Sequence, residues 1–195
     1  DDGYRHSITK VSSLHFAAHQ IYKKRIIQLG EQPKFVFNVG GLGAENIKKT
    51  ALLDRSQLKK ELNIELKKNI LIVCIQPEIT KIRTIFLTKE ILKALKFQKE
   101  KTLIFTLPGS DKFNEVIIKE IKKFENKNKN AYLFKSLGGI KFYSCLKESD
   151  AIIGNSSSGI LEMPSFQKAT INVGDRQKGR LKARSIIQVD SKMQN

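Results

Sequence analysis

Short apolar runs alternate with longer amphipathic runs along this sequence, which is the pattern of strands followed by helices. The clearest apolar run, residues 70–75, is hydrophobic on both faces, as a buried parallel strand is. Further strands are predicted at 14–18, 35–39, 102–107, 131–134, 150–153, 169–173 and 186–189. Helices are predicted at 19–29, 55–62, 79–97, 111–124, 140–147 and 159–166. This alternation predicts an α/β fold with a doubly wound, mostly parallel sheet that helices cover on both faces.

The glycine-rich stretch at residues 40–43 is the predicted hinge between two parts of the chain. It separates a small leading piece, residues 1–40, from a doubly wound domain, residues 41–195. In open α/β sheets, ligands bind at the carboxyl ends of the strands. We therefore expect the functional residues in the loops that follow Ile75, Ile153 and Val173.

Length and composition indicate a globular protein. The 195 residues are 40% hydrophobic, which suffices for a core. No apolar run approaches the ~18–20 residues that span a bilayer, and the polar start Asp1-Asp2-Gly3 carries no signal peptide. We therefore expect a cytoplasmic protein with no membrane partner. The first residue is not Met, so a processed or truncated chain is expected.

The net charge of +17 raises the question of nucleic-acid binding. The excess is mostly Lys, interleaved with Asn, Glu and Ile along helix-like segments. No compact Arg-aromatic cluster of the kind that stacks bases is present. The pattern favours a solvated surface, so no nucleic-acid partner is expected.

The cysteines and histidines indicate structural positions. Cys74 and Cys145 are far apart in apolar contexts, so they form no CxxC motif and are expected to be reduced core thiols. His15 lies within an apolar strand and is expected to be structural, whereas His19 is expected at the surface. No metal or cofactor is predicted.

The sharpest segment runs from Asp150 to Glu162, where a strand ends in Gly154 and a Ser-rich turn leads into a helix. Free N–H groups and hydroxyls at a helix start favour an anion, and glycine lets the backbone approach a phosphate closely. Glu162 then lies about one turn inside the predicted helix, where it can accept hydrogen bonds from a ribose diol. The alternative is that Ser156 only caps the helix.

A cationic loop, residues 172–180, follows the next strand and reaches the same edge of the sheet. Arg176 can pair with a diphosphate through its fork of donors. The Ser-rich turn and the Arg loop together predict a phosphate site better than either does alone.

The strings GNSSSGILE, GDRQKGR and DDGYRHSITKVSSLHF together resemble the hydrolysing UDP-N-acetylglucosamine 2-epimerases. These enzymes produce N-acetylmannosamine for sialic-acid-type sugars. The segments RIIQLGEQPKFVFNVGGLGAENI and SLGGIKFYSCLKESDAIIG also fit, so the likeness runs through nearly the whole chain. It implies a GT-B-type fold of two Rossmann-like domains with substrate in the cleft. This chain would hold the end of the first domain and most of the second.

The resemblance also implies a set of roles. The implied UDP-binding residues are Gly154 and Asn155 in the turn, Ser156 and Ser157 at the diphosphate, Glu162 at the ribose, Arg176 at the phosphates, and the backbone near Ser136 and Leu137 at the uracil. The substrate would be a UDP-acetamido sugar, and the full-length protein would be a homo-oligomer.

The chemistry that the resemblance implies begins with proton abstraction at C2 of the sugar and anti elimination of UDP. Water then adds to the glycal and leaves free N-acetylmannosamine. Such a mechanism needs carboxylates as acid and base and stabilisation of the departing diphosphate. Asp1 and Asp2 match a family acidic pair, and Arg5 and His6 match the residues after it. The alternative is that they form a solvated terminus.

Three departures from the family pattern stand out. Gln76-Pro77 replaces the usual His-Pro, and glutamine cannot shuttle a proton near neutral pH. Residues 166–170 lack the usual small residue and Pro, which should affect packing more than chemistry. Most of the amino-terminal domain has no counterpart in this sequence.

Other readings stay open at this point. A GT-B glycosyltransferase or a non-hydrolysing epimerase would share the fold and the way in which UDP is bound. A non-catalytic UDP-binding fragment agrees with Gln76 and the missing domain. A basic nucleic-acid binder would show a steep salt dependence of its affinity for DNA.

Overall fold

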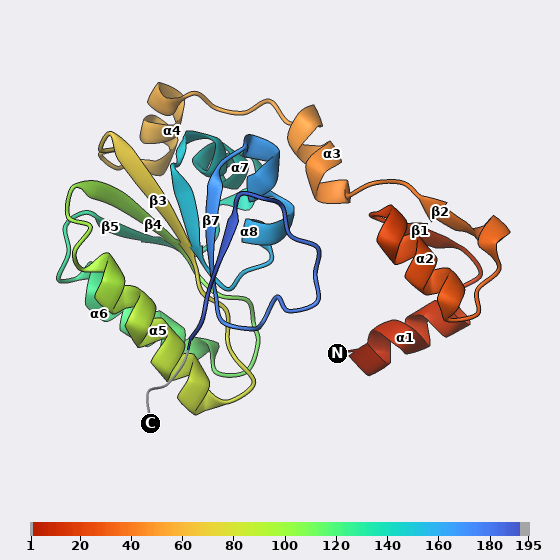
Figure 1. Ribbon diagram of the computed structural model, residues 1–195. Coiled ribbons are helices and arrows are strands. Elements are labelled where there is room, and N and C mark those ends of the chain that lie inside the picture. Colours follow the sequence, from red (N-terminus) through yellow and green to blue (C-terminus); the bar gives the residue numbers. More distant parts are fainter. Residues whose placement is uncertain (1, 192–195) are drawn as a thin grey trace. The chain divides into compact units, whose positions relative to one another are not determined.

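The computed structural model describes residues 2–191, and the chain forms two compact units that divide between Lys49 and Thr50 (Figure 1). Sequence placed the hinge at residues 40–43. Helix α3 (Leu42–Lys49) begins within that stretch and is grouped with the first unit. The helix was not predicted from sequence, because Gly43 has a low helix propensity and made the stretch look like a linker.

The first unit contains a two-stranded parallel sheet in which β1 (His15–Ala17) pairs with β2 (Val36–Asn38). Its other elements are α1 (Asp2–Val11), α2 (Gln20–Gln28) and the 3-10 turn η1 (Pro33–Phe35). His15 is buried with its Nε2 3.2 Å from Glu31 Oε2, and exposed His19 caps α2 by accepting a bond from Ile21 N–H. Both placements confirm the predictions.

Helix α1 was not predicted, and its composition explains why. The hydroxyls of Ser7, Thr9 and Ser12 donate to the carbonyl oxygens four residues earlier, at 2.9, 3.0 and 2.6 Å. Ser and Thr side chains that bond locally are neutral to unfavourable inside helices, so propensity argued for an irregular start.

The second unit is a six-stranded parallel sheet with the order β5-β4-β3-β6-β7-β8, which confirms the predicted α/β class (Figure 1). The strands are β3 (Asn69–Cys74), β4 (Lys101–Thr106), β5 (Ala131–Phe134), β6 (Ala151–Gly154), β7 (Ala169–Val173) and β8 (Ile186–Val189). The helices are α4 (Arg55–Leu62), α5 (Lys81–Leu95), α6 (Asn114–Glu125), α7 (Gly138–Glu148) and α8 (Ser158–Leu161), followed by the 3-10 turn η2 (Met163–Phe166).

Helices cover both faces of this sheet, as the double winding requires. Leu71 and Val73 of β3 pack with α5 and α6, whereas Ile70 and Ile72 pack with α4 and α7. Because successive strand side chains point to opposite faces, an uninterrupted apolar strand can serve two cores.

Local capping decided where the helices begin. Helix α4 starts as predicted because Asp54 and Gln57 form a capping box. Helix α5 starts at Lys81, two residues after the predicted position, because Thr80 is its N-cap. Helix α6 starts at Asn114 and not at Asp111, because Phe113 adopts a left-handed backbone with φ +74° that no helix accommodates.

Within residues 2–191, no helix is both long and apolar enough to cross a bilayer.

Candidate functional site

The strand order of the second unit reverses at β3. This strand comes first along the chain, yet it lies between β4 on one side and β6 on the other. In open parallel sheets, ligands bind at the carboxyl ends of the strands at such a switch point. The loops after β3, β6 and β7 leave neighbouring strands at this edge, which we call the carboxyl edge. Two of them, after β3 and β6, flank the switch point directly.

Gly154 brings β6 and β3 together at the carboxyl edge. Its φ is +140°, and a Cβ at this position would lie 2.0 Å from the carbonyl oxygen of Cys74. No side chain fits there without moving the backbone of β3. The glycine is therefore required by strand packing, whatever it contributes to ligand binding.

Asn155 follows and is fully buried. Its Oδ1 accepts a bond from Gln76 N–H at 2.7 Å, and its Nδ2 donates to Gln76 O and to Glu78 Oε1, both at 2.9 Å. The carbonyl oxygen of Asn155 accepts a bond from Nε2 of buried Gln177 at 2.8 Å. The hydrogen bonds of this one residue therefore connect the loops that follow β3, β6 and β7. Sequence reasoning assigned Asn155 to UDP, and the structure commits its side-chain amide to other protein groups.

Ser156 and Ser157 lie half-buried at the start of α8. Ser156 Oγ accepts a bond from Ser158 N–H at 3.3 Å, which is the local capping that sequence left as the alternative. Ser157 is the N-cap residue, and its side chain makes no capping bond. Its hydroxyl is therefore not committed to the helix start.

Helix α8 is only four residues long, shorter than predicted. Pro164 has no N–H to continue the α-helical ladder, so the chain changes to the 3-10 turn η2 after Glu162. Glu162 consequently lies at the end of α8 and not inside a longer helix. Because so short a helix sums few peptide dipoles, anion binding here depends on hydroxyls and nearby cations.

Glu162 is half-buried, and its Oε2 atom is buried without a hydrogen-bond partner among residues 2–191. Burial raises the pKa of this carboxyl above its ordinary value, while a hydrogen bond from Ser158 and the charge of Arg180 oppose the rise. A buried carboxylate oxygen without a donor costs free energy that a ligand hydroxyl can recover. The position therefore suits a group that donates hydrogen bonds, such as a ribose diol.

Arg176 lies in the loop after β7, with its Nη2 4.0 Å from Asp111 Oδ2. Asp111 follows β4, and the exposed fraction of its side chain is 63%, against 34% for Arg176. An ion pair this long and this exposed contributes little to stability. The guanidinium is therefore available for a stronger partner.

Gln76 follows β3, and its side chain is oriented by the next loop. Its Oε1 accepts a bond from Gly109 N–H at 3.1 Å. At the carboxyl end of β5, Ser136 is exposed and its Oγ accepts a bond from Gly138 N–H at 3.3 Å, while Leu137 is buried at the start of α7. These placements put both loops at the carboxyl edge.

The remaining predicted catalytic residues belong to the first unit. Arg5 and His6 lie exposed on α1, and Asp2 is the first residue of that helix. Asp1 lies outside the described residues. Their roles remain predictions from the resemblance.

Sequence reasoning missed Glu78 and Gln177. Glu78 accepts a bond from Thr84 Oγ1 through its carbonyl oxygen at 3.5 Å, and Gln177 has an Oε1 atom that is buried without a partner in the described chain. Both reach Asn155 from loops far away in sequence. A polar residue in a loop carries no local sign that it will be buried, so only the tertiary contacts reveal them.

The cysteines are confirmed as buried free thiols. Burial raises the pKa of Cys74 to about 11 and that of Cys145 to about 12. Thiols that ionise so high are poor nucleophiles at neutral pH.

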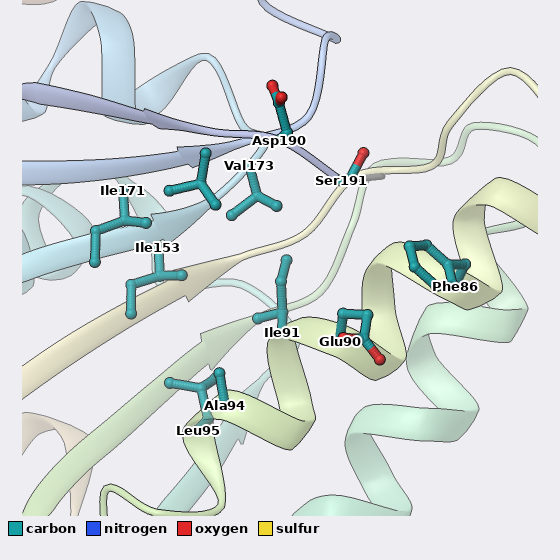
Figure 2. Close-up of a pocket in the computed structure, with 11 residues that line it drawn as sticks. Phe86, Glu90, Ile91, Ala94, Leu95, Ile153, Ile171, Val173, Asp190 and Ser191 are labelled. Atoms are coloured by element: carbon teal, nitrogen blue, oxygen red, sulfur yellow. The ribbon is translucent and has the colours of Figure 1, made fainter. Parts of the chain in front are cut away.

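An apolar groove of about 310 Å³ lies between α5 and the β6–β8 side of the sheet (Figure 2). Ile91, Ala94 and Leu95 of α5 form one wall, and Ile153, Ile171 and Val173 of the sheet form the other. Its ionisable lining groups are the carboxylates of Glu90 and Asp190. Because it offers no cation and two anions, this groove does not suit a diphosphate.

The chain resembles known proteins along its whole length. The family model described as UDP-N-acetylglucosamine 2-epimerase matches residues 1–195. A Campylobacter jejuni protein named GDP/UDP-N,N'-diacetylbacillosamine 2-epimerase (hydrolyzing) is 45% identical over 96% of this chain and 49% of its own length. The Escherichia coli polysialic acid biosynthesis protein P7 is 40% identical over 97% of this chain and 48% of its own. The chain therefore spans about half the length of the curated relatives it matches.

Solved structures agree on the fold. The Methanocaldococcus jannaschii UDP-GlcNAc 2-epimerase in complex with UDP-GlcNAc and UDP matches with a TM-score of 0.68 and 17% identity, over 93% of this chain and 51% of that one. The Neisseria meningitidis enzyme bound to UDP-GlcNAc matches with a TM-score of 0.59 and 18% identity, over 94% and 50%. The Rossmann-like parallel sheet is thus the fold of half of a GT-B-type 2-epimerase.

Proposed function

Because the chain belongs to the UDP-N-acetylglucosamine 2-epimerase family, we propose that its carboxyl edge binds the UDP part of a UDP-acetamido sugar. We propose further that the complete protein catalyses the hydrolysing 2-epimerisation. In this reaction UDP is eliminated, water adds to the resulting glycal, and free N-acetylmannosamine or the corresponding diacetamido sugar is released.

The observation that carries the proposal is the Oε2 of Glu162 at the carboxyl edge, which is buried and has no hydrogen-bond partner in the described part of the chain. A ribose diol supplies two hydroxyl donors, and a carboxylate accepts both. The preceding turn offers the Ser157 hydroxyl, and the loop after β7 offers Arg176, whose ion pair with Asp111 is long and exposed. A carboxylate for the ribose and cationic or hydroxyl donors for the phosphates are the complement of a nucleoside diphosphate.

These groups also serve the proposed elimination step. When the C1–O bond of the sugar breaks, negative charge grows on the departing UDP. The Arg176 guanidinium and the serine hydroxyls stabilise that charge where it develops. Proton removal at C2 needs a separate base, which Gln76 cannot be, because an amide neither accepts nor releases a proton near neutral pH. We assign base and acid roles to Asp1 and Asp2, and a further catalytic role to Arg5, on the resemblance alone.

The hydrolysing outcome is favoured by the Campylobacter jejuni relative, whose name specifies hydrolysis. The same name specifies a diacetamido sugar, so UDP-N-acetylglucosamine and UDP-linked diacetamido sugars are both candidate substrates. A non-hydrolysing epimerase would release UDP-N-acetylmannosamine, and a glycosyltransferase would transfer the sugar to an acceptor. Identification of the products separates the three.

One observation favours a second candidate function, UDP-sugar binding without turnover. The position after β3 holds Gln76 where the family usually has histidine, and its side chain bonds to Gly109. Restoring histidine in a complete protein should raise turnover if that position takes part in proton transfer. No change in turnover would show that proton transfer is independent of it.

The first experiment is calorimetric titration of this chain with UDP. We expect Ser157→Ala and Arg176→Ala to weaken binding, and Glu162→Gln to weaken UDP and uridine alike, because the ribose is common to both. Lys178→Ala is the matched control, since Lys178 is an exposed cation in the same loop. A folded chain that does not bind UDP, or equal losses for Arg176→Ala and Lys178→Ala, would contradict the proposed site.

A further inference from the structure

Lysine side chains gather on α5, on α6 and at the edge where the parallel strands begin, which we call the amino edge. Helices α5 and α6 pack side by side on one face of the sheet (Figure 1). A groove of about 420 Å³ lies between them, and a second groove of about 300 Å³ lies at the amino edge. The two grooves share Lys127 and Asn128, so they form one continuous surface. The lysines that line this basic surface are Lys67, Lys89, Lys93, Lys96, Lys99, Lys123, Lys127 and Lys129.

Little of this positive charge is neutralised by the protein itself. Every one of these lysines is exposed, and the carboxylates that line the two grooves are Glu100 and Glu120. Within residues 2–191, Lys123 alone among these lysines forms an ion pair, with Glu120 at 2.9 Å. Because like charges held close together repel, the basic surface favours a partner that carries many negative charges.

Hydrogen bonds hold the segments of the basic surface in place. Asn130 Nδ2 donates to Gln98 O at 3.0 Å and to Lys101 O at 2.7 Å, which joins the start of β5 to the start of β4. Asn128 Nδ2 donates to Phe124 O at 2.7 Å and fixes the end of α6. The lysines therefore project from a defined backbone and not from a loose tail.

An exposed aromatic ring accompanies these lysines. Phe97 lies in the chain between Lys96 of one groove and Lys99 of the other, and 78% of it is exposed. Lysines beside an exposed aromatic ring are typical of proteins that bind the surface of an anionic bilayer. A nucleic-acid surface favours arginine forks and stacked aromatic rings, and the two grooves contain no arginine.

We propose that the basic surface docks the protein onto an anionic phospholipid membrane, with the lysines at the lipid phosphates and Phe97 among the upper acyl chains. The expectation of no membrane partner rested on the absence of an apolar span, which peripheral docking does not need. Sequence did not reveal the surface, because its lysines come from three segments that only the fold brings together. Since the carboxyl edge lies at the other end of the strands, the candidate site faces away from the bilayer.

Co-sedimentation of this chain with lipid vesicles tests the proposal. We expect binding to vesicles of equal parts phosphatidylglycerol and phosphatidylcholine, weakened by added salt, and no binding to phosphatidylcholine alone. The triple variant Lys93→Gln/Lys96→Gln/Lys99→Gln should lower the affinity for vesicles about a hundredfold, since each lysine near such a surface contributes about fivefold. Phe97→Ser should lower it about tenfold, because the ring no longer leaves water.

The matched control is Lys48→Gln/Lys60→Gln/Lys178→Gln. It removes the same charge from exposed lysines that lie outside both grooves, so it should bind vesicles nearly as well as wild type. Urea unfolding followed by circular dichroism establishes that all variants are folded.

Four outcomes would overturn the proposal. The first is a wild-type chain that does not sediment with the anionic vesicles. The second is a control variant that loses as much affinity as the triple variant, because binding would then depend on net charge and not on this surface. The third is an undiminished affinity of Phe97→Ser, which would make the surface a general anion binder. The fourth is a chain that binds single-stranded RNA through these lysines and does not bind vesicles, which would make the partner a nucleic acid.

Discussion

Replacing Asn155 with alanine should damage both stability and ligand binding, because this one side chain joins the loops that follow β3 and β6 at the carboxyl edge. The change removes three hydrogen bonds, two to the Gln76 backbone and one to Glu78. Each neutral bond contributes about 1 kcal/mol net, and the bond to a carboxylate contributes about 2 kcal/mol. Together they predict a loss of about 4 kcal/mol in the free energy of unfolding.

Urea denaturation followed by circular dichroism measures this loss. With a slope near 2 kcal/mol per molar urea, the midpoint should fall by about 2 M. UDP affinity should fall as well, because the Gln76 loop is no longer held. Asn130→Ala is the matched control: this amide donates to Gln98 O and Lys101 O at the other end of the sheet, so it should lower stability and spare UDP binding.

Asn155→Asp tests the reasoning further. It keeps the acceptor for Gln76 N–H but turns a carboxylate toward Gln76 O and Glu78. Burial and the nearby anion should raise the pKa of the new carboxyl, so the destabilisation is greatest at pH 8 and diminishes as the pH falls and the group takes up a proton. An Asn155→Ala midpoint within about 0.3 M urea of wild type, or an Asp variant whose loss of stability does not depend on pH, would refute the Asn155 side-chain hydrogen bonds as a source of stability.

Four further predictions concern residues of the second unit. Glu162→Gln should stabilise the ligand-free chain at neutral pH. Folding raises the pKa of the Glu162 carboxyl, so the wild-type chain loses stability as the pH rises from the ordinary pKa of the group through the raised pKa. Chemical denaturation at pH 4 and pH 8 checks this, and a variant less stable than wild type at pH 8 would contradict it. In wild type, UDP affinity should rise over that same pH interval, because the ligand bonds to the ionised form; calorimetry across pH measures it, and Glu162→Gln should abolish this part of the dependence. Gly154→Ala should lower stability by about 3–5 kcal/mol, because its Cβ would meet the Cys74 backbone and its φ is +140°; a midpoint in urea close to wild type would contradict the steric argument. Cys74 and Cys145 should resist iodoacetamide at pH 8 until the chain unfolds, since thiols with pKa values of about 11 and about 12 are almost wholly protonated there, and mass spectrometry with and without urea reports the difference.

The fold could be predicted from sequence wherever the signal was local. The period of the apolar positions predicted each strand of the large sheet, and β5, β7 and β8 match the predicted ranges residue for residue. The starts of α5 and α6 could not be predicted as well, because they depend on the Thr80 cap and on the left-handed Phe113. Helices α1 and α3 were missed because hydroxyl-rich and glycine-containing segments have weak intrinsic helix propensity.

The candidate site likewise has features that sequence predicted and features that only the tertiary structure revealed. Sequence by itself determined that the Ser-rich turn and the Arg176 loop each follow a predicted strand, because the apolar runs and the chemistry of the motifs are both local features. Only the tertiary structure decided that Asn155 bonds to protein groups and that Gln76 turns its amide oxygen to Gly109. It alone also shows that Glu162 Oε2 is buried with no partner within residues 2–191. The hydrogen bonds responsible join residues 33 and 79 positions apart in the chain. Such partners are selected by the packing of strands against one another, and no pattern within a single segment specifies them.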